Sequence, residues 1–469
     1  MLIALLLVVR YLSRNSSTKI SAEPYHISSY VVEQSRSSEQ VTYKISTDSH
    51  TVTAEPAQEV TKRQEKEAVQ DNRMHKSTGE FHKLATTESS VSAINEVESK
   101  PWPGKQKRVA VIKEVEESSS LVQERGAVNI TVFYEESPDV IEALPKQFLP
   151  DYKSFCWYST QAQLFCLPSV YIAGIPKCGT TDMFDKLTWH PQIATPGYGK
   201  EHTYWNRRRL GRPSGFIKHD AEEKQSFQDF LKAFDVDKLE DVHNSMFLDG
   251  TPSLLWDLVG WETRYPQYSE PPYTNADLLH SVTPDAKIIV MLRDPVKRLV
   301  SDYVYFEAGR SREEKMMQTP LSFHDDVYFE MDRFGKCLKE DSLLNCCHSS
   351  ENSVTLRLHL GVYVCYISEW KRLFRDKLLV LTLEEYSKDP MVTLTRVFKF
   401  LDVDKPDTGE LEKFIIQSKT RNSNDKGQGN FGKPMDATVK LLRDFYEPYN
   451  NNLALLLNDS KFYFDWESV

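Results

Sequence analysis

The stretch GIPKCGTT, residues 174–181, contains residue types that commonly bind anions. An apolar, β-rich segment, 169–175, leads into this stretch, and residues 180–190 after it carry apolar side chains at a helical spacing. A tight loop between a strand and a helix directs several backbone N–H groups and the helix dipole at one point. The stretch therefore predicts a site for a phosphate or a similar anion.

The lysine of this loop stands in an unusual position. A Walker A loop reads G-x-x-x-x-G-K-[ST], with lysine directly after the last glycine. Here Lys177 precedes Gly179, and Thr180 and Thr181 follow it. Gly179 allows a tight turn, Lys177 supplies a positive charge, and the threonines supply hydroxyl donors. The alternative is an ordinary turn between strand and helix, capped by threonine.

A second candidate phosphate site lies in RDPVKRLVSDY, residues 293–303, which begins at the end of the apolar segment of residues 286–294. Arg293 stands at the carboxyl end of a predicted parallel strand, where open α/β sheets bind ligands. Ser301 lies about two helical turns farther on, and Pro295 suits the first turn of that helix. A guanidinium binds phosphate oxygens in a bidentate manner. The alternative is an arginine–aspartate pair that caps the helix.

Strand-like and helix-like segments alternate over the second part of the chain. The apolar segments 169–175, 286–294 and 377–386 are each followed by an amphipathic, helix-like segment. This alternation predicts an α/β fold, a parallel sheet flanked by helices with right-handed crossovers.

Composition divides the 469 residues into three parts. Residues 1–13 begin with an apolar run that is shorter than the roughly 20 residues a membrane span needs, and we interpret it as a signal-anchor remnant or a signal segment. Residues 14–144 are polar and bury too little apolar surface to fold, which predicts a largely disordered stem. Within it, 130–134 could form a short strand. Residues 145–469 are predicted to form the folded domain that carries both motifs.

The seven cysteines form no C-x-x-C pair, so a zinc site is not expected. Cys156 would pair with Cys166, and Cys337 with Cys346 or Cys347, in an oxidising lumen. The alternative is a cytosolic protein with reduced thiols. Three N-x-[ST] sequons favour the lumen, and they begin at Asn15, Asn129 and Asn458.

The two phosphate motifs together resemble those of sulfotransferases, which use 3′-phosphoadenosine 5′-phosphosulfate as donor. PKCGTT resembles their 5′-phosphosulfate loop, and R-D-P-x-x-R-x-x-S-x-Y resembles their 3′-phosphate motif. The resemblance implies a P-loop-type sulfotransferase fold and no metal. It places the donor against Lys177, Cys178, Gly179, Thr180, Thr181, Arg293 and Ser301, with Cys178 as a bystander thiol.

A basic, glycine-rich loop, residues 418–435, could close over the same nucleotide, as a late loop does in related sulfotransferases. Arg421 and Lys426 are its candidate donor-binding residues. The equal alternative is a solvated loop that binds nothing.

The acceptor side is expected in GKEHTYWNRRRLGR, which begins at Gly199. Glycosaminoglycan sulfotransferases often carry a Lys-Glu pair there, which implies that Glu201 is the general base. Lys200 and His202 would contact the substrate, although the usual pattern places one residue between the glutamate and the histidine. The alternative is a surface carboxylate paired with Lys200.

A basic run follows the Lys-Glu pair, and its members are Arg207, Arg208, Arg209 and Arg212. The formal net charge of the whole chain is −10, so non-specific nucleic-acid binding is not expected and this local excess of positive charge stands out. Arg207 and Arg208 would suit the sulfates and carboxylates of a glycosaminoglycan. The alternative is a solvated basic turn.

The segments 247–257 and 442–450 extend the resemblance to carbohydrate sulfotransferases that act on chondroitin or dermatan sulfate. It implies a single-pass type II Golgi membrane protein with a lumenal catalytic domain, acting at C6 of 4-sulfated N-acetylgalactosamine. The rival hypotheses are a P-loop kinase of small molecules and a non-catalytic lumenal glycan-binding protein.

Overall fold

The structure is a computed structural model, and it describes residues 31–37, 40–46, 51–54, 127–197, 199–212, 224–307, 319–350, 352, 356–404, 406–417 and 431–464. The chain divides into two compact units, Met1–Val97 and Glu98–Val469. The first unit contains a three-stranded antiparallel sheet, although this region was expected to be largely irregular. Its strands are β1 (Val31–Ser37), β2 (Gln40–Ser46) and β3 (Thr51–Ala54).

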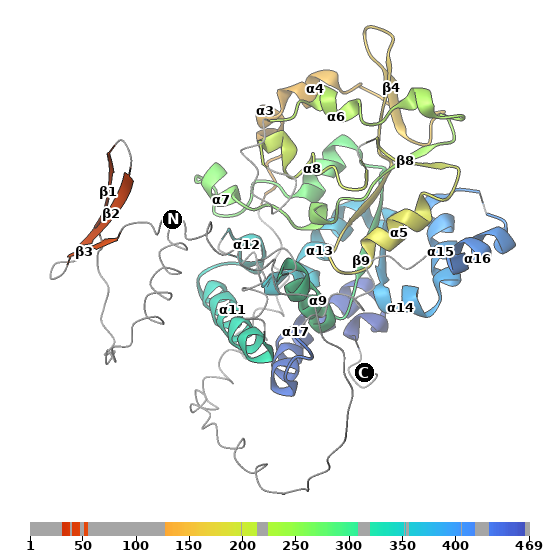
Figure 1. Cartoon of the computed structure of the whole chain (residues 1–469). Coiled ribbons are helices and arrows are strands. Elements are labelled where there is room, and N and C mark those ends of the chain that lie inside the picture. The colour runs from red at the N-terminus through yellow and green to blue at the C-terminus, as the bar shows by residue number, and fades with distance from the viewer. Residues whose placement is uncertain are drawn as a thin grey trace, which may run out of the picture. The chain divides into compact units, whose positions relative to one another are not determined.

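A five-stranded sheet forms the centre of the second unit, in the order β10-β9-β6-β8-β7 (Figure 1). Every neighbouring pair in this sheet is parallel, which confirms the predicted sheet. All residues of β6 and β8 are buried, as expected of strands covered on both faces. The strands are β6 (Val170–Gly174), β7 (Ile193–Ala194), β8 (Met246–Asp249), β9 (Lys287–Leu292) and β10 (Leu378–Thr382).

Three of these strands lead directly into helices, as the alternation predicted. The last of the three predicted strands is shorter than expected, because Thr382 caps the next helix and forms a capping box with Glu385. The helices after β6, β9 and β10 are α5 (Thr180–Leu187), α9 (Pro295–Glu307), α14 (Leu383–Lys388) and α15 (Pro390–Leu401).

The remaining helices cover the sheet and each other; α13, for example, packs against α8, α17 and β10. They are α6 (Phe227–Leu231), α7 (Trp261–Arg264), α8 (Asn275–Val282), α11 (Pro320–Glu340), α12 (Leu343–His348), α13 (Tyr363–Phe374), α16 (Thr408–Gln417) and α17 (Asp436–Leu457).

The compact fold begins before residue 145. Two short helices, α3 (Thr131–Glu136) and α4 (Pro138–Ala143), precede that position, so the segment considered as a strand at 130–134 is helical. Phe133 and Val140 are fully buried in the core of the second unit. The polar composition of the preceding region conceals these two buried residues, because a single buried side chain in each six-residue helix leaves little periodic signal.

Two disulfides form, Cys156–Cys166 and Cys337–Cys346, so Cys346 rather than Cys347 is the partner in the second pair. The first disulfide joins directly paired residues of the hairpin β4 (Phe155–Tyr158) and β5 (Leu164–Leu167). Within the described residues, no helix is long and apolar enough to cross a membrane, and no cluster of His, Cys, Asp and Glu could hold a metal ion. The expected anchor, 1–13, lies outside the described residues.

A buried charge network fixes helix α9 to the rest of the fold. Asp302 accepts hydrogen bonds from Arg298 Nη1 at 3.0 Å and from Arg357 Nε at 2.9 Å. Arg298 also donates to the carbonyl oxygen of Arg357 at 2.7 Å, and all three side chains are buried. Burial alone would raise the pKa of Asp302, but the Arg357 and Arg298 guanidiniums hold that pKa below its ordinary value. The neighbouring Ser301 is thereby held in place.

We predict that Asp302→Asn lowers the free energy of unfolding by about 3–5 kcal/mol, because it leaves two buried guanidiniums without their carboxylate. The measurement is urea denaturation at neutral pH. The control is Asp444→Asn, whose partner Lys440 is exposed and which should cost less than about 1 kcal/mol. Because the pKa of Asp302 is depressed in the folded state, its contribution is present above the unfolded pKa of roughly 3.9 and disappears as the pH falls below it. Equal losses in the two variants would contradict this role.

Candidate functional site

The predicted phosphate loop connects β6 to α5, and its backbone has a conformation that few residues tolerate. Gly179 has φ +82°, and a Cβ atom there would lie 2.7 Å from Cδ1 of Leu383, so only glycine fits without a shift. Lys177 has φ +72°, a left-handed value that costs a lysine about 1–3 kcal/mol. Helix α5 begins at Thr180 and directs its first N–H groups at this loop.

The ammonium of Lys177 lies in a region of concentrated positive charge. Its Nζ is 3.8 Å from the centroid of the exposed Tyr305 ring. Burial lowers the pKa of Lys177, the Asp302 carboxylate opposes that shift, and the Arg293 and Arg357 guanidiniums reinforce it. A bound anion would relieve this repulsion.

Arg293 links the two predicted phosphate segments. It follows the last residue of β9, and its Nη1 donates to the carbonyl oxygen of Lys177 at 3.4 Å. The hydroxyl of Tyr363 donates to the Arg293 carbonyl oxygen at 2.7 Å, which fixes this backbone position. Cys178 of the same loop is fully buried, and burial raises the pKa of its thiol to about 12. It therefore stays protonated, as expected of a bystander.

A cavity of about 250 Å³ opens beside Arg293, between α9 and the start of α17. It combines cationic and hydroxyl groups with apolar walls, which suits a nucleotide that carries a phosphate. Its lining consists of Arg293, Asp294, Val296, Lys297, Val300, Ser301, Val304, Phe431, Gly432, Pro434, Val439 and Arg443.

Two cations of this cavity, Lys297 and Arg443, were not anticipated from the sequence. Lys297 lies midway between Arg293 and Ser301 at helical spacing, so the helix pattern alone could have indicated it. Arg443 comes from α17, far along the chain, and no local signal points to it. Arg421 and Lys426, the candidates from the late loop, lie outside the described residues.

The predicted acceptor loop reaches the same edge of the sheet. Gly250, which follows β8, donates its N–H to the carbonyl oxygen of Lys200 at 3.0 Å. A Cβ on Gly250 would lie 2.6 Å from Phe184 of α5, so the acceptor loop, β8 and the phosphate-loop helix meet there. Lys200 Nζ lies 2.5 Å from Glu201 Oε1, and the Glu201 side chain is 48% exposed. Glu201 is thus accessible to a substrate.

His202, expected to contact the substrate, lies in the interior instead. It is 2% exposed and packs against the rings of Phe230 and Tyr204. Burial and then the Arg208 charge lower its pKa to about 3, and its Nε2 lies 3.3 Å from Gln225 Nε2. A neutral, buried imidazole is a packing residue in this structure.

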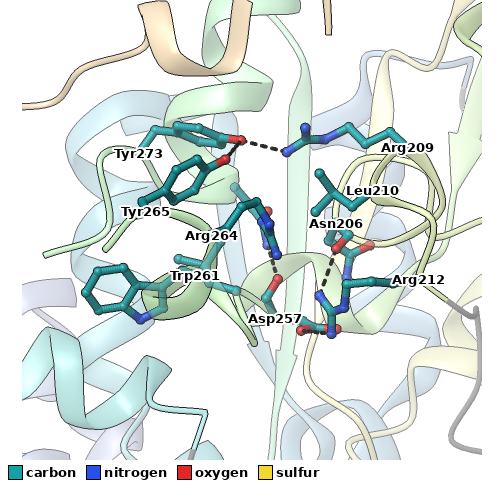
Figure 2. Close-up of a pocket in the computed structure, with 11 residues that line it drawn as sticks. Asn206, Arg209, Leu210, Arg212, Asp257, Trp261, Arg264, Tyr265 and Tyr273 are labelled. Carbon is teal, nitrogen blue, oxygen red and sulfur yellow. Dashed lines mark hydrogen bonds and ion pairs between the residues drawn. The ribbon is translucent and has the colours of Figure 1, made fainter. Parts of the chain in front are cut away.

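Two members of the basic run, Arg209 and Arg212, line a pocket in the protein (Figure 2), and Arg207 is buried as well. Arg207 is buried and pairs with Asp257 at 2.5 Å, and Arg212 pairs with the same carboxylate at 3.1 Å. Arg207 was expected to bind the glycan, but its guanidinium instead helps hold the pKa of the fully buried Asp257 below its usual value, against the effect of burial.

Arg209 pairs with an acid from the N-terminal helices. Its Nη1 lies 2.9 Å from Glu136 Oε2, and its Nη2 donates to Tyr273 (Figure 2). Within the basic run, Arg208 is half-buried, and its Nε has no hydrogen-bond partner in the part of the chain that the structure describes. Of the two arginines expected to bind the substrate, Arg208 is therefore the less buried.

Comparison with known proteins agrees with these features. Residues 167–433 match the family model described as Sulfotransferase domain, more than half of the chain. Carbohydrate sulfotransferase 15 from Rattus norvegicus is 31% identical over 319 residues, which is 64% of this chain and 55% of that protein. The Homo sapiens protein of the same name is 29% identical over 385 residues, covering 69% of this chain and 67% of that protein. The chain thus spans about half to two thirds of the length of these relatives.

A solved sulfotransferase from Alicyclobacillus acidocaldarius covers 64% of this chain and 99% of its own, at 20% identity and a TM-score of 0.43. The parallel sheet, the phosphate loop with its lysine before the glycine, and the match across residues 167–433 lead to one conclusion, which confirms the resemblance of the sequence. The chain belongs to the sulfotransferase family.

Proposed function

We propose that this protein transfers a sulfuryl group from 3′-phosphoadenosine 5′-phosphosulfate to a hydroxyl group of a glycosaminoglycan. The observation that carries the proposal is the junction of two phosphate-binding segments, made by the hydrogen bond from Arg293 to the carbonyl oxygen of Lys177. This donor has an anionic group at each end of one ribose, so it needs two cationic sites a fixed distance apart. The loop and the cavity beside it supply such a pair.

Different residues of the chain would bind the two anionic ends of the donor. Lys177 and the N–H groups at the start of α5 would hold the 5′-phosphosulfate, with Thr180 and Thr181 as hydroxyl donors. Arg293 and Ser301, which line the cavity, would hold the 3′-phosphate. The apolar walls of the cavity add surface for the nucleoside.

Glu201 would act as general base on the acceptor. Its carboxylate accepts the proton of the attacking hydroxyl, whose oxygen forms a bond to sulfur while the bond from sulfur to the 5′-phosphate oxygen breaks. Adenosine 3′,5′-bisphosphate leaves, and Lys177 stabilises the charge that develops on its 5′-phosphate. Transfer of this kind passes through a loose transition state, so positioning and charge stabilisation supply most of the acceleration.

For the acceptor, we propose C6 of 4-sulfated N-acetylgalactosamine in chondroitin or dermatan sulfate. The support is the resemblance of segments 247–257 and 442–450 to N-acetylgalactosamine 4-sulfate 6-O-sulfotransferase, together with the carbohydrate sulfotransferase relatives. We further propose the Golgi lumen as the site of action, with a type II membrane anchor. The two disulfides favour an oxidising compartment.

The acceptor is tested by incubating the protein with labelled donor and a panel of chondroitins, followed by disaccharide analysis. The expected result is label at C6 of 4-sulfated units and little label on unsulfated chondroitin. Label at another position would refute the acceptor while leaving the reaction type in place. Absence of transfer, with chondroitin binding unaffected by adenosine 3′,5′-bisphosphate, would instead support the glycan-binding rival.

Calorimetric titration distinguishes the nucleotide of a sulfotransferase from the ATP that a kinase would bind. We expect adenosine 3′,5′-bisphosphate to bind and ATP with magnesium to bind much more weakly. Arg293→Ala should weaken the bisphosphate by roughly 10- to 100-fold, because it removes a charged hydrogen bond worth about 1.5–3 kcal/mol. The control is Lys232→Ala, an exposed lysine paired with exposed Asp229. An unchanged Kd in Arg293→Ala, or tight binding of ATP alone, would overturn the assignment.

We predict that Lys177→Ala lowers kcat by about 10²- to 10³-fold, since it removes a cation that acts on the developing charge. The half-buried position of Lys177 on a loop makes loss of the fold unexpected, and circular dichroism checks this. Turnover close to wild type in a folded Lys177→Ala protein would contradict the role of this lysine.

A further inference from the structure

The turn Asp249-Gly250-Thr251 leaves β8 at the edge of the sheet where the phosphate loop lies. Strand β8 is the parallel neighbour of β6, with Asp249 in register with Tyr171. Asp249 and Thr251 are each only 2% exposed, so neither side chain is presented to solvent. Their partners are therefore to be sought within the protein.

Two hydrogen bonds join this turn to the loop of Glu201. Gly250 donates its N–H to the carbonyl oxygen of Lys200 at 3.0 Å. Thr203 donates its N–H to Oγ1 of Thr251 at 3.2 Å. The first bond falls one residue before Glu201 and the second two residues after it, so the turn holds the backbone on both sides of the proposed base.

Asp249 gives the Thr251 hydroxyl its orientation. Thr251 Oγ1 donates to Asp249 Oδ1 at 2.6 Å, and the same oxygen accepts the Thr251 N–H at 2.9 Å. With its proton committed to Asp249, the hydroxyl offers a lone pair to Thr203. The three residues form a chain of hydrogen bonds from the end of β8 to the acceptor loop.

The loop is held in a conformation that its sequence does not favour. Thr203 has φ +60°, a left-handed value that is uncommon for a β-branched residue. Its own Oγ1 is buried and has no hydrogen-bond partner within the described part of the chain. Such a conformation persists only where the surroundings impose it, and in this loop Glu201 is exposed between the partly buried Lys200 and the buried His202.

The stability of the fold does not explain why a carboxyl group is buried at Asp249. It is fully buried, and burial raises its pKa to about 6; the Thr251 bonds lower that pKa, and the neighbouring Glu201 and Lys200 charges act on it in opposite directions. The Asp249 carboxylate also raises the pKa of the buried Tyr171. The Asp249 group is a carboxyl in the interior and within electrostatic reach of the Glu201 carboxylate, and both features raise its pKa.

We propose that Asp249 and Thr251 are positioning residues for the transfer reaction, which fix the backbone of the Glu201 loop so that its carboxylate meets the acceptor hydroxyl. The catalytic consequence rests on the proposed function of Glu201. The two hydrogen bonds that join the Asp249–Thr251 turn to the Glu201 loop, called the clamp below, do not depend on that function.

The clamp is tested by hydrogen–deuterium exchange on the whole chain, with a disruptive and a conservative variant at each position. Thr251→Val and Asp249→Leu remove the hydrogen bonds, and exchange should rise at least tenfold over residues 200–206 while peptides of α9 keep their protection. Thr251→Ser and Asp249→Asn keep an acceptor oxygen and should retain the wild-type pattern. Unchanged exchange in Thr251→Val and Asp249→Leu overturns the proposal.

Kinetics test the consequence for catalysis. Thr251→Val should lower kcat at least tenfold without changing the Kd of adenosine 3′,5′-bisphosphate, and Thr251→Ser should restore most of kcat. A purely structural role would weaken nucleotide binding in parallel, and that result would overturn the proposal. If the wild-type protein transfers sulfate to no glycan but the exchange pattern holds, the proposed function fails and the clamp stands. Normal kcat in Thr251→Val overturns the positioning role and leaves the proposed function intact.

Discussion

Parallel pairing of β6 with β8 and β9 is the constraint on which the rest of the site depends. Parallel strands end at one edge of a sheet, and ligands bind to such folds outside these carboxyl ends. Strand β6 lies between β9 and β8, so the phosphate loop after β6 has Arg293 on one side and the Asp249 turn on the other. Strand pairing thereby brings Lys177 and Arg293, which are 116 residues apart in the chain, within hydrogen-bond distance of each other.

Charge imposes the second condition. The proposed donor site concentrates Lys177, Arg293 and Arg357 within electrostatic reach of one another, and this repulsion would oppose folding of the empty protein. The buried Asp302 offsets part of it, since it pairs with Arg357 and Arg298 and also acts on the ammonium of Lys177. The network is therefore a structural counterpart to the anion that the site is proposed to bind.

The sequence predicted the parts of the fold whose signals are local. The strands at 169–175 and 286–294, the helices after them and the loop glycine each carry their own pattern within about ten residues. The sequence did not predict strand β8, because its four residues, three apolar and one acidic, are too few to show a period. The choice of Cys346 over Cys347 could not be predicted, since adjacent residues on helix α12 point in different directions and only the tertiary fold selects one.

The acceptor side shows why residue types alone were insufficient there. A run of arginines is typical of a polyanion site. Whether each guanidinium faces outward, however, depends on acidic side chains elsewhere in the chain. Asp257 follows the run by about 50 residues, and Glu136 precedes it by about 70. Neither carboxylate has a recognisable motif, so their partnership with Arg207 and Arg209 became visible only in the structure.

The same ion pairs leave an excess of positive charge among these arginines. Four guanidiniums share two carboxylates, because Arg207 and Arg212 meet at Asp257 while Arg209 and Arg264 meet at Glu136. This group of six side chains carries a net positive charge in a partly buried, low-dielectric region, where charges are screened less than at an open surface. A chain with a formal net charge of −10 thus contains a local group of side chains whose own charges sum to a positive value. In the proposed reaction, the arginines that hold the acceptor loop in shape would therefore also attract the sulfated glycan.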